Sequence, residues 1–459
     1  MSFPRYPHYK PSGVEWLGEV PEHWSVGKSR FYISILSGFA FQSAGFSDNP
    51  SDVKLLRGIN VSISRLKWDD TVYWRREKGD GLDIYEMKAG ELVIGMDRPI
   101  INEGIRVAIV RECDLPCLLL QRVACLKTGS RLMSNYIFYI MSTESLFATH
   151  FAPDTTGVSV PHISPEQIGN YPIPIPPICE QQAIAHFLCD ETVKIDALVA
   201  EQQRLIELLK EKRQAVISHA VTKGLDPTVP MKPSGIEWLG DIPAHWKATA
   251  LKRLARPGKK TFVDGDWIES PFICNDGIRL IQTGNIGIGY YKEQGYRYIS
   301  ESTFEELQCT EIFPRDVLIC RLDGPVGRAC LAPDLGVRMI TSVDNAILKP
   351  SDDIFPEFVV SLLSSVPWIA WMDALCRVGG GFRLRVSRSQ LGEILLPIPP
   401  FDEQVLIAQH LSTLATEWDV LTAEAERAIE LLQERRTALI SAAVTGQIDV
   451  RQLAQGVAA

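Results

Sequence analysis

Two stretches of the chain repeat apolar residues at alternating steps of four and three, the pattern of a coiled-coil helix. The first seam runs through Ile184, Leu188, Glu191, Ile195, Leu198, Gln202, Leu205, Leu209, Lys212 and Val216. The second runs through Ile407, Leu411, Leu414, Trp418, Leu421, Ala425, Ala428, Leu432, Arg435 and Leu439. A period of about 3.5 residues predicts two long helices that pair along these seams. Two separate helices, each packed on its own domain, are the alternative.

The two helical stretches belong to a tandem duplication of the whole chain. Residues 174–222 match residues 397–445 at 26 of 49 positions, and residues 10–24 match residues 232–246 at 11 of 15. A solenoid normally needs at least about three repeats, so two like halves favour pairing about a pseudo-two-fold axis. This pairing makes the two long helices antiparallel.

Between each repeated loop and each helix lies a region of about 150 residues whose two copies have diverged. Short strand-like runs with glycine-rich turns, and helical stretches near residues 133–147 and 355–375, predict a mixed α/β domain in each copy. The predicted class is α+β, with two mixed α/β domains separated by two long antiparallel helices in a coiled coil. The predicted segments are a signature loop (1–24), the first variable domain (25–170), a central helix (171–224), a linker with the repeated loop (225–246), the second variable domain (247–396), a C-terminal helix (397–446) and a tail (447–459).

The net charge of −9 is unevenly distributed. Each variable domain is neutral, with 16 basic and 16 acidic residues in the first and 18 of each in the second. The helical tracts carry the acidic excess, which favours protein partners there, whereas a neutral domain can still present a basic face to nucleic acid. Ten cysteines without a Cys-x-x-Cys pair, and no apolar run of about 20 residues, predict a cytoplasmic chain with reduced thiols.

Catalytic and metal-binding motifs are incomplete in this sequence. The Pro-Pro pairs at residues 176–177 and 399–400 lack the preceding polar residue of a DNA amino-methyltransferase, and Glu86 with Lys88 lacks the Pro-Asp of a metal-dependent nuclease. There is no phosphate-binding lysine motif of a motor. His23 and His245, each between Pro and Trp, are interpreted as structural residues. The sequence therefore predicts neither a catalytic residue nor a metal site.

The chain resembles the specificity subunit of type I restriction–modification enzymes. The shared features are the Pro-Ser-Gly-Val/Ile-Glu-Trp-Leu-Gly loop, the variable domain, the Pro-Ile-Pro-Pro-x-x-Glu-Gln helix start and the Ile-Glu-Leu-Leu-x-Glu-x-Arg helix, in this order and twice. The resemblance implies a non-catalytic subunit whose variable domains are target-recognition domains. Each would read one half of a bipartite, asymmetric site in double-stranded DNA, while the helices set the spacing and dock two methyltransferase subunits.

The resemblance also implies motor-nuclease subunits in the larger complex. This chain would bind no cofactor, and its partners would use S-adenosylmethionine, ATP and Mg. A coiled-coil adaptor whose variable domains bind proteins is the main alternative. The incomplete catalytic motifs disfavour a free-standing nuclease or methylase.

Candidate DNA contacts follow from residue chemistry, because Arg and Lys suit guanine, Asn and Gln suit adenine, and phosphates accept from many donors. In the first variable domain the predicted contacts are Arg57, Asn60, Arg98, Arg106, Gln121, Arg122, Thr155, Thr156, Ser159 and His162. In the second they are Gln282, Thr283, Asn285, Arg321, Arg328, Asn345, Arg377, Arg383, Arg385 and Arg388. The cluster at residues 377–388 surrounds three glycines that would let the backbone approach a phosphate. A solvated basic loop paired with nearby acids is the alternative for this cluster.

Overall fold

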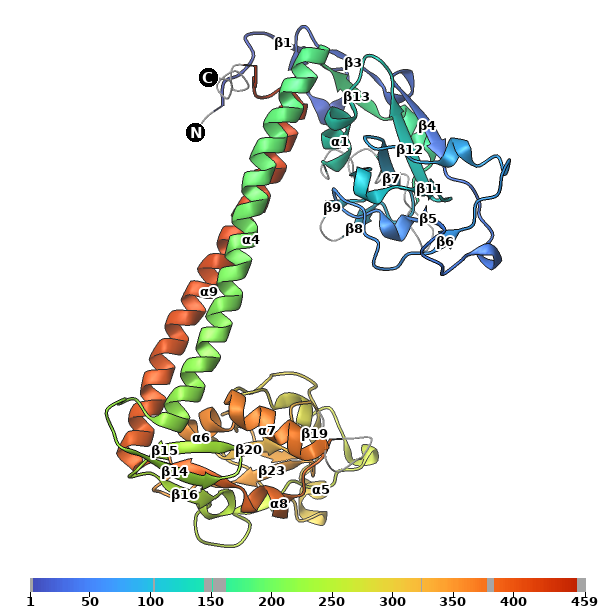
Figure 1. The fold of residues 1–459 in the computed structure, drawn as a ribbon. Helices are drawn as coiled ribbons and strands as arrows, with labels where there is room; N and C mark the ends of the chain where they lie inside the picture. The colour runs from blue at the N-terminus through green and yellow to red at the C-terminus, as the bar shows by residue number, and fades with distance from the viewer. Residues whose placement is uncertain are drawn as a thin grey trace. The chain divides into compact units, whose positions relative to one another are not determined.

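The computed structural model describes residues 3–101, 104–143, 151, 162–322, 324–377 and 384–451, which form two compact units (Figure 1). Unit 1 contains Met1–Gln202 and Arg427–Ala459, and unit 2 contains Gln203–Glu426. Each unit therefore holds one variable domain together with a part of each long helix.

Unit 1 is built on two small sheets. The larger has the order β10-β7-β12-β4 and is antiparallel, and the smaller has the order β11-β5-β6, with β11 and β5 parallel. These strands are β4 (Ile33–Ser37), β5 (Val53–Leu56), β6 (Tyr73–Trp74), β7 (Leu92–Gly95), β10 (Val107–Ile109), β11 (Cys117–Leu119) and β12 (Val123–Thr128). Around them lie β1 (Tyr9–Pro11), β2 (Glu19–Pro21), β3 (Ser25–Lys28), β8 (Ile100–Ile101), β9 (Gly104–Ile105), α1 (Ser134–Ser142), α3 (Pro165–Asn170) and β13 (Pro172–Ile175).

Unit 2 repeats this topology. Its larger sheet has the order β21-β20-β23-β17, its smaller sheet has the order β22-β18-β19, and β18 and β22 are again parallel. The strands are β17 (Phe262–Asp264), β18 (Ile278–Ile281), β19 (Tyr298–Ile299), β20 (Val317–Cys320), β21 (Ala329–Leu331), β22 (Met339–Thr341) and β23 (Asn345–Leu348). Around them lie β14 (Met231–Ile236), β15 (Leu239–Pro243), β16 (Lys247–Ala250), α5 (Glu301–Glu306), α6 (Pro356–Leu362), α7 (Val366–Arg377), α8 (Arg388–Glu393) and β24 (Leu395–Ile398). The shared strand order confirms the predicted α+β class and the duplication.

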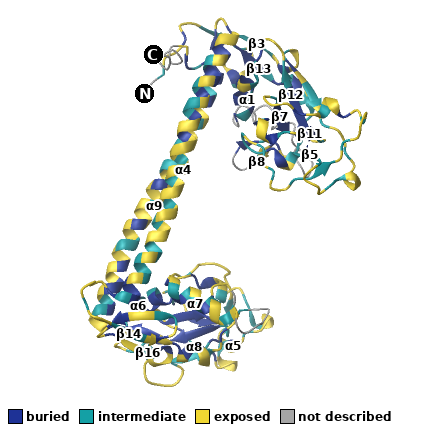
Figure 2. Ribbon diagram, viewed as in Figure 1, coloured by how far each residue is buried: buried dark blue, intermediate teal, exposed yellow. Residues whose placement is uncertain are grey.

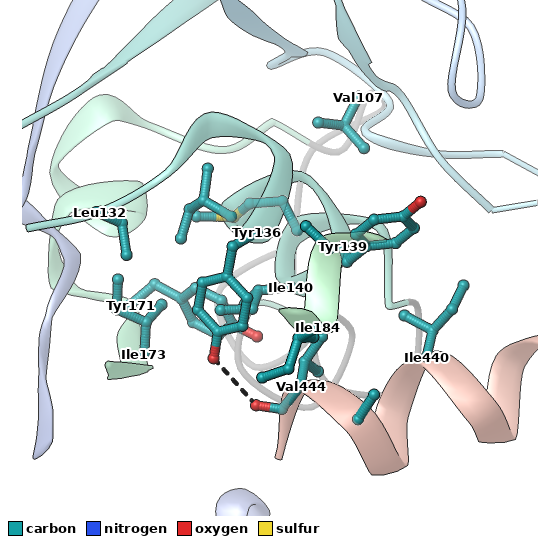
Figure 3. Close-up of a cluster of buried hydrophobic side chains, with 14 of the residues drawn as sticks. Val107, Leu132, Tyr136, Tyr139, Ile140, Tyr171, Ile173, Ile184, Ile440 and Val444 are labelled. Carbon is teal, nitrogen blue, oxygen red and sulfur yellow. Dashed lines mark hydrogen bonds between the residues drawn. The ribbon is translucent and has the colours of Figure 1, made fainter. Parts of the chain in front are cut away.

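Each unit closes its core with the end of the other repeat's long helix. In unit 1, Tyr136 from α1 packs with Ile173 from β13, Ile184 from the first long helix and Val444 from the second (Figure 3). The Tyr136 hydroxyl donates to the Val444 carbonyl oxygen at 3.3 Å. In Figure 2 the buried residues concentrate in the sheets and at the helix ends. Residues far apart in the chain therefore form one core.

The two long helices, α4 (Ile178–Lys223) and α9 (Phe401–Val444), are antiparallel, as predicted. In unit 1, Arg436 Nε lies 3.1 Å from Asp196 Oδ1, which joins late α9 to early α4. In unit 2, Arg213 Nη1 lies 2.6 Å from Asp419 Oδ1, which joins late α4 to early α9. The same two repeat positions thus make both ion pairs.

The predicted seam is wrong at alternate positions. Leu198 and Leu205 are 45% and 42% exposed, whereas their neighbours Val199 and Ile206 are partly buried. The same shift by one residue moves the seam from Glu191 to Thr192, from Lys212 to Arg213, from Leu421 to Thr422 and from Arg435 to Arg436. The buried line keeps the 3.5-residue period but takes its steps of four and three in the opposite order, so the period alone does not choose between the two neighbouring positions. The buried line therefore includes polar residues that the apolar pattern missed.

A Glu-Gln pair anchors the start of each long helix to its variable domain. Gln181 donates to the Arg131 carbonyl at 2.9 Å and accepts from the Met133 backbone at 2.9 Å. Gln404 makes the equivalent bonds to Asp353 at 3.1 Å and from Phe355 at 2.8 Å. These bonds fix the angle at which each helix leaves its domain.

Glu180 and Glu403, the glutamates of these pairs, contact the signature loops. Glu180 Oε1 lies 2.7 Å from His23 Nε2, and Glu180 Oε2 accepts from Trp24 Nε1 at 3.0 Å. In unit 2, Glu403 Oε2 lies 2.7 Å from His245 Nε2. Both histidines therefore connect the signature loop to the helix.

No single helix among the described residues is long and apolar enough to cross a membrane. The bent pair α6 and α7 reaches the required length and composition only when both helices are counted across a 60° bend. Buried residues of this pair, including Phe358 and Trp368, belong to the core of unit 2.

Candidate nucleic-acid interface

One edge of the unit 1 sheets gathers several loops. Strands β4 and β7 end there and β12 begins there, because β12 is antiparallel to both. Backbone bonds from Leu120 to Leu56 at 3.1 Å and from Gln121 to Phe39 at 2.8 Å join the ends of β5 and β11 to this edge. We call residues 38–41, 57–60, 97–98 and 120–122 the loop edge of unit 1.

Unit 2 has the equivalent loop edge at residues 265–268, 282–285, 321–322 and 342–344. The geometry matches at single residues: Gly38 and Gly265 both approach the neighbouring loop so closely that a Cβ would lie 2.2 Å from Leu120 O and 2.3 Å from Ser342 O. Asp97 forms a β-bridge with His162, and Leu322 forms one with Arg385. Corresponding segments of the two repeats therefore form the corresponding loop edge in each unit.

Two predicted asparagines are structural, which corrects their assignment as DNA contacts. Asn60 and Asn285 are 1% and 2% exposed. Their side-chain oxygens accept from the Arg57 and Gln282 backbones at 3.0 and 2.8 Å, and their amides donate to the carbonyls of Lys67 and Lys292 at 2.9 and 3.0 Å. Each therefore closes a turn inside its domain.

Arg106 and Arg328 brace the same turns. Arg106 Nη1 donates to Gly58 O at 2.7 Å, and Arg328 Nη2 donates to Thr283 O at 2.9 Å. Arg328 Nε also donates to Ile286 O at 2.7 Å. These guanidiniums support the turns of the loop edge while remaining partly exposed, so their contact with DNA stays a prediction.

Arg321 and Asn345 are also buried, at 3% and 0% exposure. Arg321 donates to Val343 O at 2.6 Å and lies 3.0 Å from Asp264 Oδ1. Burial lowers the pKa of Arg321, while Asp264 opposes that shift. Asn345 donates to Thr341 Oγ1 at 2.9 Å. Both belong to the interior, and their assignment as DNA contacts was wrong.

Other predicted residues remain accessible at the loop edges. Arg98, Gln121, Arg122, Arg377 and Arg385 are exposed, whereas Arg57, His162, Gln282, Thr283 and Arg388 are partly buried. Arg98 and Arg122 hold left-handed backbones with φ of +44° and +74°. Thr155, Thr156, Ser159 and Arg383 lie outside the described residues.

Several of the accessible residues have acidic neighbours, as the alternative interpretation of residues 377–388 expected. Arg57 lies 3.0 Å from Asp70 Oδ1, and Arg377 Nε donates to Asp373 Oδ2 at 2.8 Å. Arg388 Nη1 donates to Phe262 O at 2.8 Å. His162 Nδ1 lies 2.6 Å from Asp97 Oδ1. The basic residues are therefore oriented by internal contacts.

The structure adds exposed apolar residues that residue chemistry had not selected. Ile59 and Trp267, in the loop edges, are 58% and 70% exposed, and Tyr296, in a nearby loop of unit 2, is 62% exposed. Buried Arg279 supports that loop by donating to Gln294 O at 3.0 Å, with its guanidinium 5.2 Å from the centre of the Tyr296 ring. Exposed aromatic rings can stack on bases. Each lies one or two residues after a glycine, which was the available sequence signal.

Comparison with known proteins shows which family this chain resembles. Residues 85–208 match the family model of the type I restriction modification DNA specificity domain. The specificity subunit of the type I restriction enzyme EcoBI from Escherichia coli is 25% identical over 452 residues, which cover 96% of this chain and 90% of that subunit. Over most of its length the chain is similar to a type I restriction–modification specificity subunit.

A further specificity subunit and two solved structures are also similar to this chain. The EcoAI specificity subunit of Escherichia coli is 32% identical over 196 residues, which span 43% of this chain and only 32% of that subunit. The fold matches a chain from a structure of type I R-M complex assembly and conformational transition, with a TM-score of 0.69, 14% identity and coverage of 93% and 98%. It also matches the HsdS subunit from Thermoanaerobacter tengcongensis, with a TM-score of 0.56, 15% identity and coverage of 94% and 98%. Both Escherichia coli relatives are specificity subunits of type I restriction enzymes.

Proposed function

We propose that this chain recognises DNA for a type I restriction–modification system, with each variable domain reading one half of a bipartite, asymmetric site. The observation that carries the proposal is a common loop edge with different side chains in the two units. Positions Asp97, Arg122 and His162 of unit 1 correspond to Leu322, Asp344 and Arg385 of unit 2. Because side chains read base edges directly, the same scaffold with different residues would select two different half-sites.

The proposed role of α4 and α9 is to set the spacing and to bind two methyltransferase subunits. These helices are acidic and leave Leu198, Leu205, Leu208 and Leu431 between 42% and 48% exposed. Exposed apolar rows on an acidic helix suit a protein partner better than a phosphate backbone. In this proposal the partner subunits, including motor-nuclease subunits in a larger cytoplasmic complex, use S-adenosylmethionine, ATP and Mg.

Binding of the subunit with its methyltransferase partner to duplex DNA tests the proposal. We expect affinity to fall steeply with salt, because neutralised phosphates release counterions, and to depend on base sequence in two separate blocks. A protein-binding adaptor would show neither property. Binding that ignores both salt and sequence would refute DNA recognition by this chain.

The spacing role has its own test in paired insertions. One heptad inserted after Gln202 in α4 and one after Glu426 in α9 lengthens both helices by about 10 Å, at about 1.5 Å per residue. At about 34 Å per helical turn of DNA, the gap between the half-sites should grow by about three base pairs. A heptad in α4 alone, which mismatches the seam, is the control and should disrupt assembly. An unchanged gap with both insertions would remove the spacing role.

A further inference from the structure

Two exposed arginines, Arg122 and Arg385, each lie beside a carboxylate that comes from another segment of the same unit. The side chains of Arg122 and Arg385 are 53% and 54% exposed, and each faces a carboxylate. Arg122 Nη1 lies 3.7 Å from Asp97 Oδ1, and Arg385 Nη2 lies 3.3 Å from Asp344 Oδ1. A guanidinium has several N–H donors in a planar fork, so one carboxylate restricts its direction and leaves donors for a ligand.

The two units take the arginine and the carboxylate of this pair from different segments. Arg122 directly precedes β12 in unit 1, and the residue directly preceding β23 in unit 2 is the carboxylate, Asp344. Arg385 instead occupies the bridge position that His162 holds in unit 1. Ion pairs between exposed side chains contribute little to stability. Stability alone therefore does not account for an arginine–carboxylate pair at the same edge of both units.

The backbone of Arg122 also argues for a role of its side chain. Its φ of +74° lies in the left-handed region, where a Cβ is unfavourable and glycine is preferred. Strained residues of this kind collect at functional sites. Glycine would suit this backbone better, which points to a use for the arginine side chain at this position.

The neighbouring carboxylates indicate what the guanidiniums bind. Asp97 and Asp344 would repel a phosphate placed against the paired arginine, whereas a base edge carries no formal charge. Guanine offers two acceptors in the major groove, N7 and O6, which match the arginine fork. The charge arrangement therefore favours a guanine edge over the DNA backbone.

We propose that Arg122 and Arg385 each read one guanine, one in each half-site, by donating two hydrogen bonds to N7 and O6. Asp97 and Asp344 act as positioning residues that hold each fork toward the base. This inference rests on the proposed DNA-recognition function and deepens it by assigning a base and a residue to each half-site.

Selection of duplexes from a randomised library by the complex with its methyltransferase partner tests the inference. The variants are Arg122→Gly, Arg122→Ala and Arg385→Ala. The matched controls are Arg76→Ala and Arg338→Ala, whose guanidiniums pair with Asp80 and Glu311 at 2.8 and 2.9 Å. Arg76 follows β6 and Arg338 precedes β22, so both lie at the opposite strand ends from the loop edges.

We expect a guanine in each wild-type half-site. Arg122→Gly and Arg122→Ala should reduce the preference for one guanine about 5- to 150-fold in one half-site, Arg385→Ala should do so in the other, and the controls should change neither. Arg122→Gly should also keep or raise the thermal stability of unit 1, because it relieves the left-handed backbone. Loss of specificity without loss of stability would support a reading role.

Asp97→Asn and Asp344→Asn test the positioning role. Each should lower guanine discrimination while raising affinity for unrelated duplexes, because a negative charge beside the DNA is removed. A carboxylate with a purely structural role would change stability and leave the base preference intact, which would overturn the positioning assignment.

Two further outcomes separate the inference from the function beneath it. Unchanged guanine preference in the arginine variants, or an equal loss on all sequences with a salt slope reduced by about one, would assign the arginines to scaffold or phosphate contact and overturn the inference. Absence of any two-block motif in the wild-type selection would instead overturn the proposed function itself.

Discussion

Replacing Glu180 by alanine should destabilise unit 1 much more than replacing its repeat counterpart Glu403 destabilises unit 2. Both glutamates lie in the first turn of a long helix, so the favourable interaction with the helix dipole is common to both. Their surroundings differ. The Glu180 side chain is 7% exposed, whereas that of Glu403 is 27% exposed.

The expected magnitudes follow from the hydrogen bonds. Glu180 accepts from Tyr6 Oη and Trp24 Nε1, both at 3.0 Å, and these two donors belong to buried side chains. Leaving a buried donor unpaired costs about 1–3 kcal/mol, so Glu180→Ala should lose about 3 kcal/mol or more. Glu403 contacts half-exposed His245, and Trp246 Nε1 has no hydrogen-bond partner among the described residues. Glu403→Ala should therefore lose only about 1 kcal/mol.

Hydrogen exchange on the full chain in increasing denaturant measures both effects separately. The backbone amides of β3 and β13 report on unit 1, and those of β16 and β24 report on unit 2. Comparison of each variant with the unaltered chain gives the loss of opening free energy in its own unit, and the other unit serves as the internal control. Equal losses in the two variants, or a loss below about 1 kcal/mol for Glu180→Ala, would refute the role assigned to the buried donors.

Two further predictions concern alkaline pH and the ends of the long helices. Burial, above all, raises the pKa of Tyr6 and Tyr136 above the ordinary value of about 10, so their stabilisation of unit 1 is complete below pH 10 and is lost above it, by up to about 1.4 kcal/mol per pH unit for each tyrosine. Unit 2 buries no tyrosine among its described residues, so hydrogen exchange between pH 10 and 12 should show unit 1 opening first, and simultaneous opening would contradict this. Gly446→Ala should destabilise unit 1 by about 2 kcal/mol or more, because φ is +76° and the new Cβ would lie 2.4 Å from the Pro21 ring. Gly224→Ala is the matched control in unit 2, where the nearest atom lies at 3.1 Å, and a loss of about 1 kcal/mol is expected in thermal unfolding; the reverse order would contradict the steric argument.

The sequence predicted the long helices and the duplication because both are local or repeated patterns. It failed on the register of the seam at Leu198 and Leu205, since both orders of three- and four-residue steps have the same period. An apolar pattern cannot show that Thr192 is buried with its hydroxyl donating to Leu188 O at 2.7 Å. Period thus predicts a helix more securely than it predicts the buried face.

At the candidate interface, residue type selected residues in loops that gather at one edge of each unit, but it did not separate accessible from structural side chains. Asn60 and Arg321 have the chemistry of base-reading residues, yet their side-chain N–H groups already donate to the backbone carbonyls of Lys67 and Val343. The carboxylates of Asp97 and Asp344 were missed because acidic residues are not expected beside DNA. Which polar side chains are buried, and which carboxylates lie beside the arginines, depends on contacts between segments of the folded chain. A single sequence does not show these contacts.

The most direct test of the account is methylome sequencing of a cell that carries this chain with its partner subunits, before and after residues 25–170 are exchanged for those of another family member. The account predicts a methylated motif of two blocks separated by a fixed gap, and it predicts that the exchange changes one block while the other block and the gap remain. A motif without two blocks, or an exchange that alters both blocks together, would contradict independent reading by the two variable domains.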